Sequence, residues 1–168
     1  MRASLLLIAL IFAAFPAQAQ NTQPVEVTPY LAVGSGGTSP VGVSVTFPIR
    51  SNLGVETDVA YRDGEGIHAL SASGSVLYFL PRAGRTTPYL AGGIGLSQYG
   101  APVLSSSGSP SGTASRLSVD LNMGGGLKVP LKDTLDLRTD ARYYQSVGRQ
   151  GWQGFRVAQG ISFDTRRR

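Results

Sequence analysis

Residues 117–129, LSVDLNMGGGLKV, decide the fold because apolar and polar residues alternate along them. One side of the alternation holds Leu117, Val119, Leu121, Met123, Leu127 and Val129, and the other holds Ser118, Asp120, Asn122 and Lys128. This period of two is the pattern of a β-strand whose two faces meet different surroundings. We therefore expect a strand here, with one apolar face and one polar face.

The same alternation recurs along the rest of the chain. It is clear in residues 41–49, 53–62, 135–143 and 155–164, and weaker in residues 27–35, 67–80 and 87–99, where Gly, Ala and Ser reduce the contrast. Together the segments predict eight strands of roughly 9–13 residues, an even number and a length that suit a barrel crossing a membrane. The predicted fold is all-β: an eight-stranded, antiparallel, up-and-down transmembrane β-barrel.

The N-terminus has the layout of a secretory signal peptide. Arg2 supplies a positive charge, residues 5–15 are an uninterrupted apolar run, and Ala17-Gln18-Ala19 is a small-x-small cleavage site. The apolar run is too short to span a bilayer as a helix. We therefore expect a cleaved signal peptide at 1–19 and one barrel domain at 20–168.

Composition narrows the class further. The chain has no cysteine, so no disulfide stabilises it, and charged residues make up only 15%. After residue 19 no apolar stretch is long enough for a membrane helix, which leaves a closed barrel as the way to cross lipid. The net charge of +5 includes Arg2 and the terminal arginines 166–168, and the remaining charges are scattered. We therefore expect no nucleic-acid partner.

The polar faces of the predicted strands carry charges of both signs in nearly equal number. The set comprises Glu56, Asp58, Arg62, Asp120, Lys128, Asp136, Arg138, Asp140, Arg142, Arg156 and Asp164. An unpaired charge inside a narrow lumen costs several kcal/mol, so a balanced set suits an enclosed lumen better than a solvated face. We expect these side chains to form a charge network that fills the lumen, with bulky residues such as Arg138 or Tyr144 lying over Gly124 and Gly126.

Aromatic residues gather near the ends of the predicted strands. Tyr30, Phe47, Tyr78, Phe79, Tyr89 and Phe163 lie toward the short turns, and Tyr61, Tyr99, Tyr143 and Phe155 lie toward the longer loops. Two such bands, separated by aliphatic residues, are typical of the girdles that barrels place at the two membrane interfaces. Tyr and Phe also favour strands in general, which is the alternative explanation.

The connections differ in length at the two ends of the predicted sheet. Residues 50–52, 81–86 and 130–134 are short turns, whereas 100–115 and 146–154 are longer. Short periplasmic turns and longer outward loops are the arrangement of outer-membrane barrels. We expect an extracellular partner, of unknown identity, to contact the loop at 100–115 and Trp152.

Two phrases in the chain, with the strand that follows the second, resemble those of the OmpA/OmpX-like and opacity-type outer membrane proteins. They are TPYLAGGIGL at 87–96 and NMGGGLKVPL at 122–131, the latter followed by residues 135–144. The resemblance implies a monomeric barrel in outer-membrane lipid, exported and then inserted by a barrel-assembly machinery that reads a last strand ending in Phe. GISF at 160–163 is similar to that ending, but DTRRR follows it.

The residues do not predict catalysis. Some small outer-membrane barrels are hydrolases, and the lipid A deacylase-like pattern places His and Ser two residues apart on one strand face. Here the one histidine is His68, Leu70 takes the serine position, and Ser71 falls on the opposite face. One histidine and no cysteine also leave too few ligands for most transition-metal sites. We expect no enzyme activity, no cofactor and no metal.

Three functions remain open at this point. The first is a non-enzymatic surface protein with a structural or adhesin-like role. The second is a narrow pore, which eight strands filled by side chains disfavour. The third is a soluble, lipocalin-like barrel with an apolar ligand inside, which would reverse the two faces of every strand.

Overall fold

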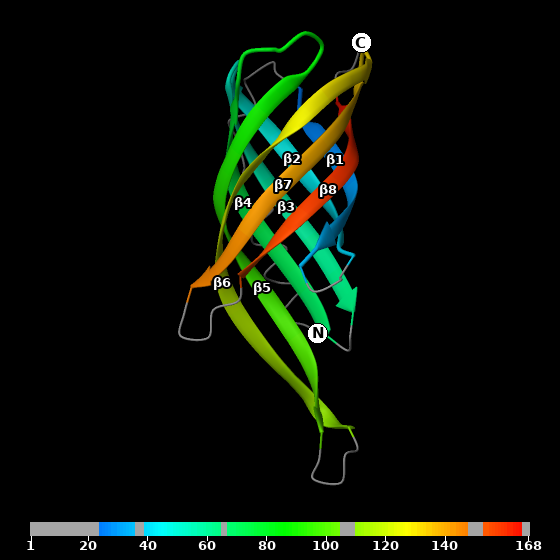
Figure 1. The fold of residues 1–168 in the computed structure, drawn as a ribbon, viewed down its shortest axis with the longest axis vertical. Helices are drawn as coiled ribbons and strands as arrows, with labels where there is room; N and C mark the ends of the chain where they lie inside the picture. The colour runs from blue at the N-terminus through cyan, green and yellow to red at the C-terminus, as the bar shows by residue number, and fades with distance from the viewer. Residues whose placement is uncertain (1–23, 36–38, 65–66, 105–109, 148–152, 166–168) are drawn as a thin grey trace.

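Eight antiparallel strands close into a single barrel, as the sequence predicts (Figure 1). The computed structural model describes residues 24–35, 39–64, 67–104, 110–147 and 153–165. The predicted signal peptide, Trp152 and the arginines at 166–168 lie outside these residues. In the described ranges no helix is long and apolar enough to cross a membrane.

Each strand pairs with its neighbours in sequence, and the last strand pairs with the first. The strands are β1 (Glu26–Gly34), β2 (Val41–Arg50), β3 (Leu53–Gly64), β4 (Ile67–Phe79), β5 (Thr87–Leu104), β6 (Pro110–Lys132), β7 (Leu135–Val147) and β8 (Gln153–Asp164). Among the described strands this closure leaves no unpaired edge, the condition that lipid imposes on a spanning sheet.

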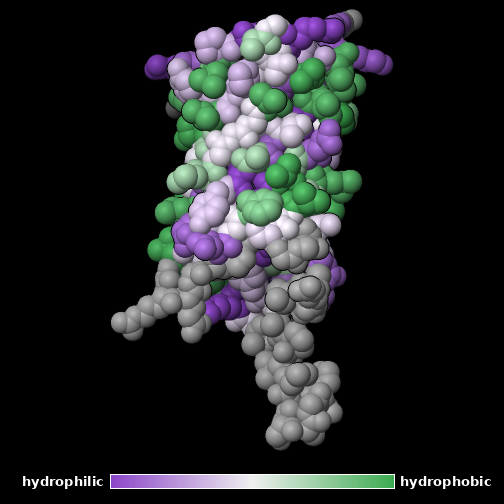
Figure 2. Space-filling model, in the orientation of Figure 1, coloured by the Kyte–Doolittle hydropathy of each residue, from purple (hydrophilic) through white to green (hydrophobic). Residues whose placement is uncertain are grey.

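The alternation in sequence becomes an alternation of burial. In β7, Arg138, Asp140 and Arg142 are buried, and the residues between them are exposed. Leu31 and Met123 are 70% and 65% exposed on the outer face. Figure 2 shows apolar side chains over the body of the visible face and hydrophilic ones at the edge formed by the short turns. The outer face is therefore suited to lipid.

The barrel interior is polar. Among the described residues, 17 buried ones are polar or charged and nine are hydrophobic. Six of these nine are alanines. A lipocalin-like barrel would have the opposite arrangement, with apolar residues inside and charges in water. The structure therefore contradicts the alternative of a soluble barrel around an apolar ligand.

The β5–β6 hairpin is longer than the sequence predicts and extends past the ends of the other strands (Figure 1). Residues 100–115 are not a loop throughout, because pairing continues from Gly100 with Ser115 to Leu104 with Pro110. A pair of strands beyond the bilayer has no lipid-facing side, so its sequence need not alternate. The Ser- and Gly-rich composition therefore concealed these strand ends.

Candidate functional site in the barrel lumen

The middle of the lumen has two unlike walls. The small-residue wall consists of inward-facing residues of β4, β5 and β6, namely Ser71, Ser73, Ser75, Ala91, Gly93, Gly95, Gly124 and Gly126. The charged wall consists of inward-facing residues of β3, β7 and β8, namely Glu56, Asp58, Arg138, Asp140, Arg142 and Arg156. Long side chains from the charged wall can therefore extend into space that the small-residue wall leaves free.

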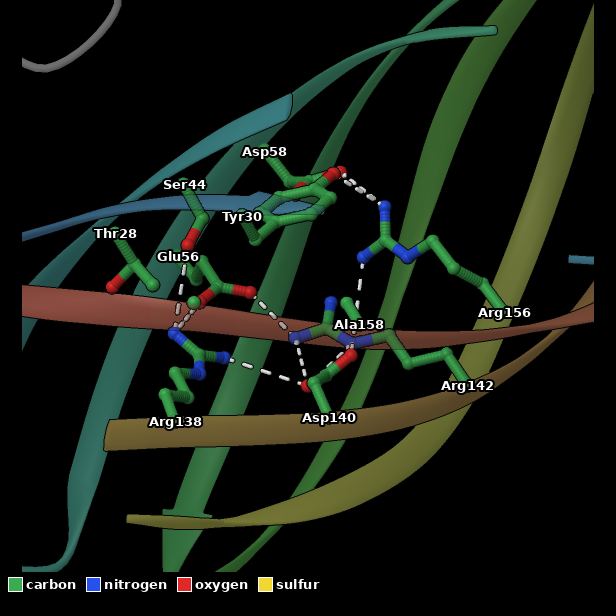
Figure 3. Close-up of a pocket in the computed structure, with 11 residues that line it drawn as sticks. Thr28, Tyr30, Ser44, Glu56, Asp58, Arg138, Asp140, Arg142, Arg156 and Ala158 are labelled. Carbon is green, nitrogen blue, oxygen red and sulfur yellow. Dashed lines mark hydrogen bonds and ion pairs between the residues drawn. The ribbon is translucent and has the colours of Figure 1, made fainter. Parts of the chain in front are cut away.

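Glu56 lies between two arginines that reach it from across the barrel (Figure 3). Arg138 Nη1 donates to Glu56 Oε2 at 2.5 Å, and Arg142 Nη2 donates to Glu56 Oε1 at 2.6 Å. Asp140, between the arginines on β7, pairs with Arg142 Nε at 2.9 Å and with Arg138 Nη2 at 3.5 Å. The carboxylate of Glu56 is thus shared by two guanidinium groups, an arrangement of charge-assisted hydrogen bonds.

Arg156 forms a second group toward the loop end of the lumen. Its Nη1 donates to Asp58 Oδ1 at 3.0 Å and to the Tyr30 hydroxyl at 2.6 Å. Its guanidinium carbon lies 4.8 Å from the Tyr30 ring centroid. The charged wall thus holds three arginines and three acids, all buried, so its formal charges balance.

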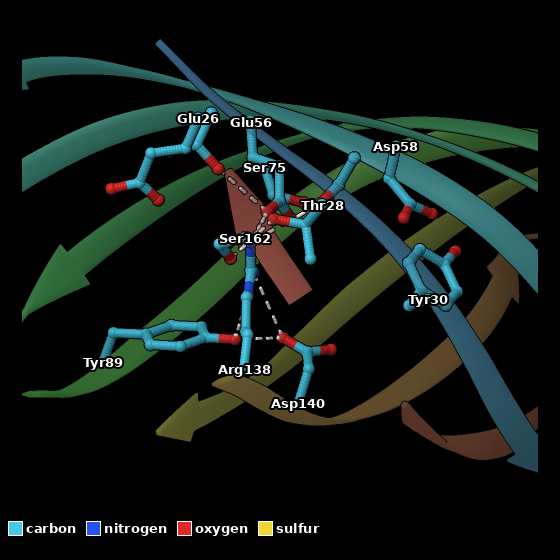
Figure 4. A network of polar contacts seen from close by, with 12 residues as sticks. Glu26, Thr28, Tyr30, Glu56, Asp58, Ser75, Tyr89, Arg138, Asp140 and Ser162 are labelled. Carbon is cyan, nitrogen blue, oxygen red and sulfur yellow. Dashed lines mark hydrogen bonds and ion pairs between the residues drawn. The ribbon is translucent and has the colours of Figure 1, made fainter. Parts of the chain in front are cut away.

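Tyr30 and Tyr89 lie in the lumen, and their prediction as girdle residues is wrong. The Tyr89 hydroxyl donates to Asp140 Oδ2 and accepts from Arg138 Nε, each at 2.7 Å (Figure 4). Both tyrosines are less than 10% exposed. Both strands belong to the weakly alternating segments, and the neighbour of each tyrosine on the same face is a small residue, Ala32 or Ala91, rather than a charged one.

Each of these tyrosines lies over a glycine of the neighbouring strand. Tyr30 pairs with Gly42, and Tyr89 pairs with Gly126. A Cβ atom at either glycine would lie 2.4 Å from the tyrosine hydroxyl oxygen. Aromatic rings commonly cover strand glycines in this way. The expectation that Arg138 or Tyr144 covers Gly126 is therefore corrected, because Tyr89 takes that place.

Tyr99 is a third predicted girdle residue on the inner face, beside Arg62 at the loop-side mouth. The Arg62 guanidinium carbon lies 5.8 Å from the Tyr99 ring centroid. Phe79 is a further predicted girdle residue on the inner face, where its ring centroid lies 5.9 Å from that of Tyr89. The remaining six occupy outward positions: Tyr61, Tyr78, Tyr143, Phe155 and Phe163 are exposed, and Phe47 is half-buried next to inward-facing Thr46. Their positions are compatible with two interfacial bands.

The remaining predicted charges lie toward the two ends of the lumen. Lys128 Nζ pairs with Glu26 at 2.5 Å and Asp136 at 3.5 Å at the short-turn end. Asp120, nearer the loops, accepts hydrogen bonds from Ser97 and Ser118. Glu26 was not among the predicted lumen residues because it precedes the first alternating segment. Its charge was the one feature of the sequence that could have indicated a place in the network.

The space left between these side chains is small in the middle of the lumen. The cavity bordered by Tyr30, Glu56, Asp58, Arg138 and Arg142 has a volume of about 10 Å³. An open bowl of about 940 Å³ lies at the short-turn end, and a cavity of about 60 Å³ lies at the loop end. The central volume is at the lower limit for a single water molecule.

His68 is exposed on the outer face at the loop end. Its Nδ1 lies 3.0 Å from Asp63 Oδ1 and 3.3 Å from the Tyr61 hydroxyl oxygen. Ser71 instead donates to the Ala60 carbonyl at 3.4 Å. The His–Ser pair of the deacylase pattern is therefore not assembled by these residues. In the described part of the chain no three His, Asp or Glu side chains are grouped to hold a metal ion.

The chain matches no protein-family model and no curated protein. Among solved structures it resembles the N-terminal β-barrel domain of Pseudomonas aeruginosa OprF, with a TM-score of 0.65 at 15% identity over 84% of this chain and 97% of that one. Neisserial surface protein A gives 0.62 at 16% identity, over 83% and 93%. The fold is that of a bacterial outer-membrane barrel.

The same fold also occurs in an enzyme. The outer membrane enzyme PagL gives a TM-score of 0.53 at 15% identity, over 82% of this chain and 98% of that one. One fold therefore carries different activities, and function must be argued from the residues of this chain.

Proposed function

We propose that the mature chain is a monomeric, non-enzymatic protein of the bacterial outer membrane with a surface-interaction or structural role. The observation that carries this proposal is the β5–β6 hairpin, which continues beyond the other strands on the loop side. A rigid barrel that holds an extended hairpin away from the membrane is suited to presenting that hairpin to a partner. The outer-membrane bilayer surrounds such a barrel, and we further propose that a barrel-assembly machinery inserts it.

The lumen supports a closed barrel rather than a pore. Glu56, Arg138, Asp140 and Arg142 meet in the middle of the lumen, leaving a cavity of about 10 Å³. Eight-stranded barrels have an interior just wide enough for side chains to fill. We propose that this charge network closes the barrel and ties its opposite walls together.

Conductance in a planar bilayer tests the closed lumen. We expect no resolved single-channel steps for the unaltered protein across neutral pH and moderate voltage. Steady conductance in preparations that show the mobility shift of a folded barrel on unheated electrophoresis would favour the pore. A preparation that is fully soluble without detergent would contradict the membrane location itself.

Whole-cell adhesion tests the surface role. Cells displaying the unaltered chain are compared with cells displaying a variant in which a two-residue Asn-Gly turn replaces residues 101–114. We expect the shortened chain to insert normally and to lose adhesion to plates coated with collagen, fibronectin or laminin. A scrambled 101–114 segment of equal composition separates hairpin length from hairpin sequence, and Trp152→Ala tests the second predicted contact. Equal adhesion by all four chains would leave only the structural role.

A further inference from the structure

The cavity at the loop-side mouth is lined by polar side chains that the proposed surface role does not explain. It has a volume of about 60 Å³, and its polar side chains are Arg62, Ser71, Ser97, Tyr99, Tyr144 and Arg156. They come from β3, β4, β5, β7 and β8, so the closure of the barrel brings them together. Arginine supplies the charge of this wall, and serine and tyrosine supply hydroxyl groups.

Arg156 is built into the cavity wall. It is 8% exposed, and its Nε, which is buried, has no hydrogen-bond partner in the described part of the chain. Its guanidinium carbon lies 4.8 Å from the Tyr30 ring centroid and 5.3 Å from that of Tyr144. Packing between two rings fixes the orientation of the guanidinium group. A buried N–H donor without an acceptor is costly, so an acceptor in the cavity would stabilise this site.

Arg62 provides a second positive charge on the opposite side of the barrel. Its guanidinium carbon lies 5.8 Å from the Tyr99 ring centroid, and its side chain is half-buried. In register, Arg62 lies opposite Ala69, and Ala69 lies opposite Tyr99, so β4 contributes only a methyl group between the two larger side chains. Arg62 thus lines the cavity while remaining accessible from the loop side.

The acids near these arginines lie outside the lining of the loop-side cavity. Asp140 borders the central cavity, and its Oδ1 lies 3.9 Å from Arg156 Nη2. Asp58 pairs with Arg156 Nη1 at 3.0 Å from the side of the central cavity, and it does not line the loop-side cavity. Asp120 accepts hydrogen bonds from Ser97 and Ser118 and also lies outside the lining. Among the described residues that line the cavity, two are arginines and none is a carboxylate, a composition suited to an anion.

The geometry points to a binding site for a small oxyanion at the loop-side mouth: a carboxylate, phosphate or sulfate group held between Arg62 and Arg156. The volume suits one such group, since it is several times the minimum of about 10–15 Å³ that holds one water molecule. Oxyanions accept several hydrogen bonds at once, which matches guanidinium groups converging from different strands beside the tyrosine hydroxyls. The ion could be free in solution or part of a lipid headgroup of the outer leaflet.

Titration of the full mature chain in zwitterionic detergent micelles tests this site. The probes are sodium phosphate, sulfate and acetate at constant ionic strength, with chloride as the reference salt. The readout is the NMR signal of the arginine side-chain Nε–Hε groups. We expect saturable shifts of the Arg62 and Arg156 signals with at least one oxyanion, and no saturable shift with chloride. Absence of a saturable shift at either arginine for all three oxyanions would overturn the proposal.

Charge-altering variants distinguish this cavity from general attraction to a basic protein. Arg62→Gln should raise the dissociation constant about tenfold by removing charge-assisted hydrogen bonds, whereas Arg85→Gln, an exposed arginine at the other end, should leave it unchanged. Asp120→Asn removes a nearby negative charge and should lower the constant. Mobility on unheated electrophoresis verifies that each variant is folded. Equal weakening by Arg62→Gln and Arg85→Gln would contradict a built site.

A lipid arm separates the two sources of the oxyanion. The protein is placed in nanodiscs of phosphatidylcholine with or without phosphate-bearing outer-leaflet glycolipid. Shifts of the Arg156 signal with free phosphate alone assign a soluble ion, and shifts with the glycolipid in phosphate-free buffer assign a headgroup. Neither result depends on the adhesion assay, so the site and the surface role can fail separately.

Discussion

The charged wall and the small-residue wall of the lumen contribute to filling the barrel interior in opposite ways. The charged wall places arginines and acids in the barrel interior, where each guanidinium group needs a carboxylate partner. The small-residue wall contributes mainly serine, alanine and glycine, and it leaves the volume that those long side chains occupy. Arg142 shows the connection, because it extends from β7 to Glu56 on β3 and to Ser75 on β4, where Nη1 lies 3.2 Å from the serine oxygen. The long charged side chains of one wall and the small side chains of the other are therefore parts of a single packing arrangement.

Glu56→Ala should have the largest effect, because it removes the carboxylate that Arg138 and Arg142 share. Breaking a buried ion pair by deleting one partner costs about 3–5 kcal/mol, since the other charge stays buried without its partner. Urea-induced unfolding in lipid vesicles or detergent measures the loss. Ser44→Ala, a buried position that lies 3.5 Å from Arg138 Nη1, serves as a control with a smaller expected loss. Equal stability of Glu56→Ala and the unaltered chain would show that the charged wall does not stabilise the barrel.

Gly126→Val tests the small-residue wall directly. The new side chain would begin 2.4 Å from the Tyr89 hydroxyl oxygen and 2.2 Å from the Thr139 carbonyl oxygen. Overpacking of this kind costs about 1–3 kcal/mol, and we expect a value toward the upper end because one neighbour is backbone. Gly74→Val is the matched control, since nothing lies within 4 Å of a Cβ atom there. The same unfolding assay should show a loss for Gly126→Val and little change for Gly74→Val.

The sequence was sufficient for the fold because alternation needs only local information. Charges such as Glu56 and Arg138 fall on the polar side of clearly alternating strands, and the structure has both inside the barrel. Their contact joins residues 82 positions apart in the chain. It depends on the stagger of strands around the closed barrel, which the alternation does not specify. For the same reason the carboxylate shared by two arginines could not be predicted.

The tyrosines were misplaced for a different physical reason. Next to Tyr30 and Tyr89, the same face carries the small residues Ala32 and Ala91, so no neighbouring charge marks that face as the polar one. The feature that would have placed these tyrosines inside is the pairing of Tyr30 with Gly42 and of Tyr89 with Gly126. Reading it requires the register between strands, which becomes known only with the structure.

Tyr89→Phe tests a contact between the two walls, and we expect it to reduce stability less than the two preceding variants. The variant keeps the ring over Gly126 but removes the hydroxyl that bonds to Asp140 and Arg138. Hydrogen bonds to charged groups contribute about 1.5–3 kcal/mol, and we expect about 2 kcal/mol of lost stability. Tyr78→Phe, on the exposed outer face, provides the control and should change stability little. Equal losses for the two variants would mean that the Tyr89 hydroxyl contributes no more than one at the lipid interface.

Asp63→Asn should have the smallest effect, although it also removes a carboxylate, here from beside His68. Asp63 and His68 lie 3.0 Å apart, yet their side chains are 59% and 58% exposed. Exposed pairs contribute about 0.2–1 kcal/mol because water and salt screen them, whereas Glu56 is buried between two arginines. Unfolding at low and high salt measures both variants: the small Asp63→Asn effect should vanish at high salt, and most of the Glu56→Ala loss should persist. A strongly salt-sensitive Glu56→Ala loss would indicate that water reaches the lumen network, and the contrast between buried and exposed pairs would then no longer hold.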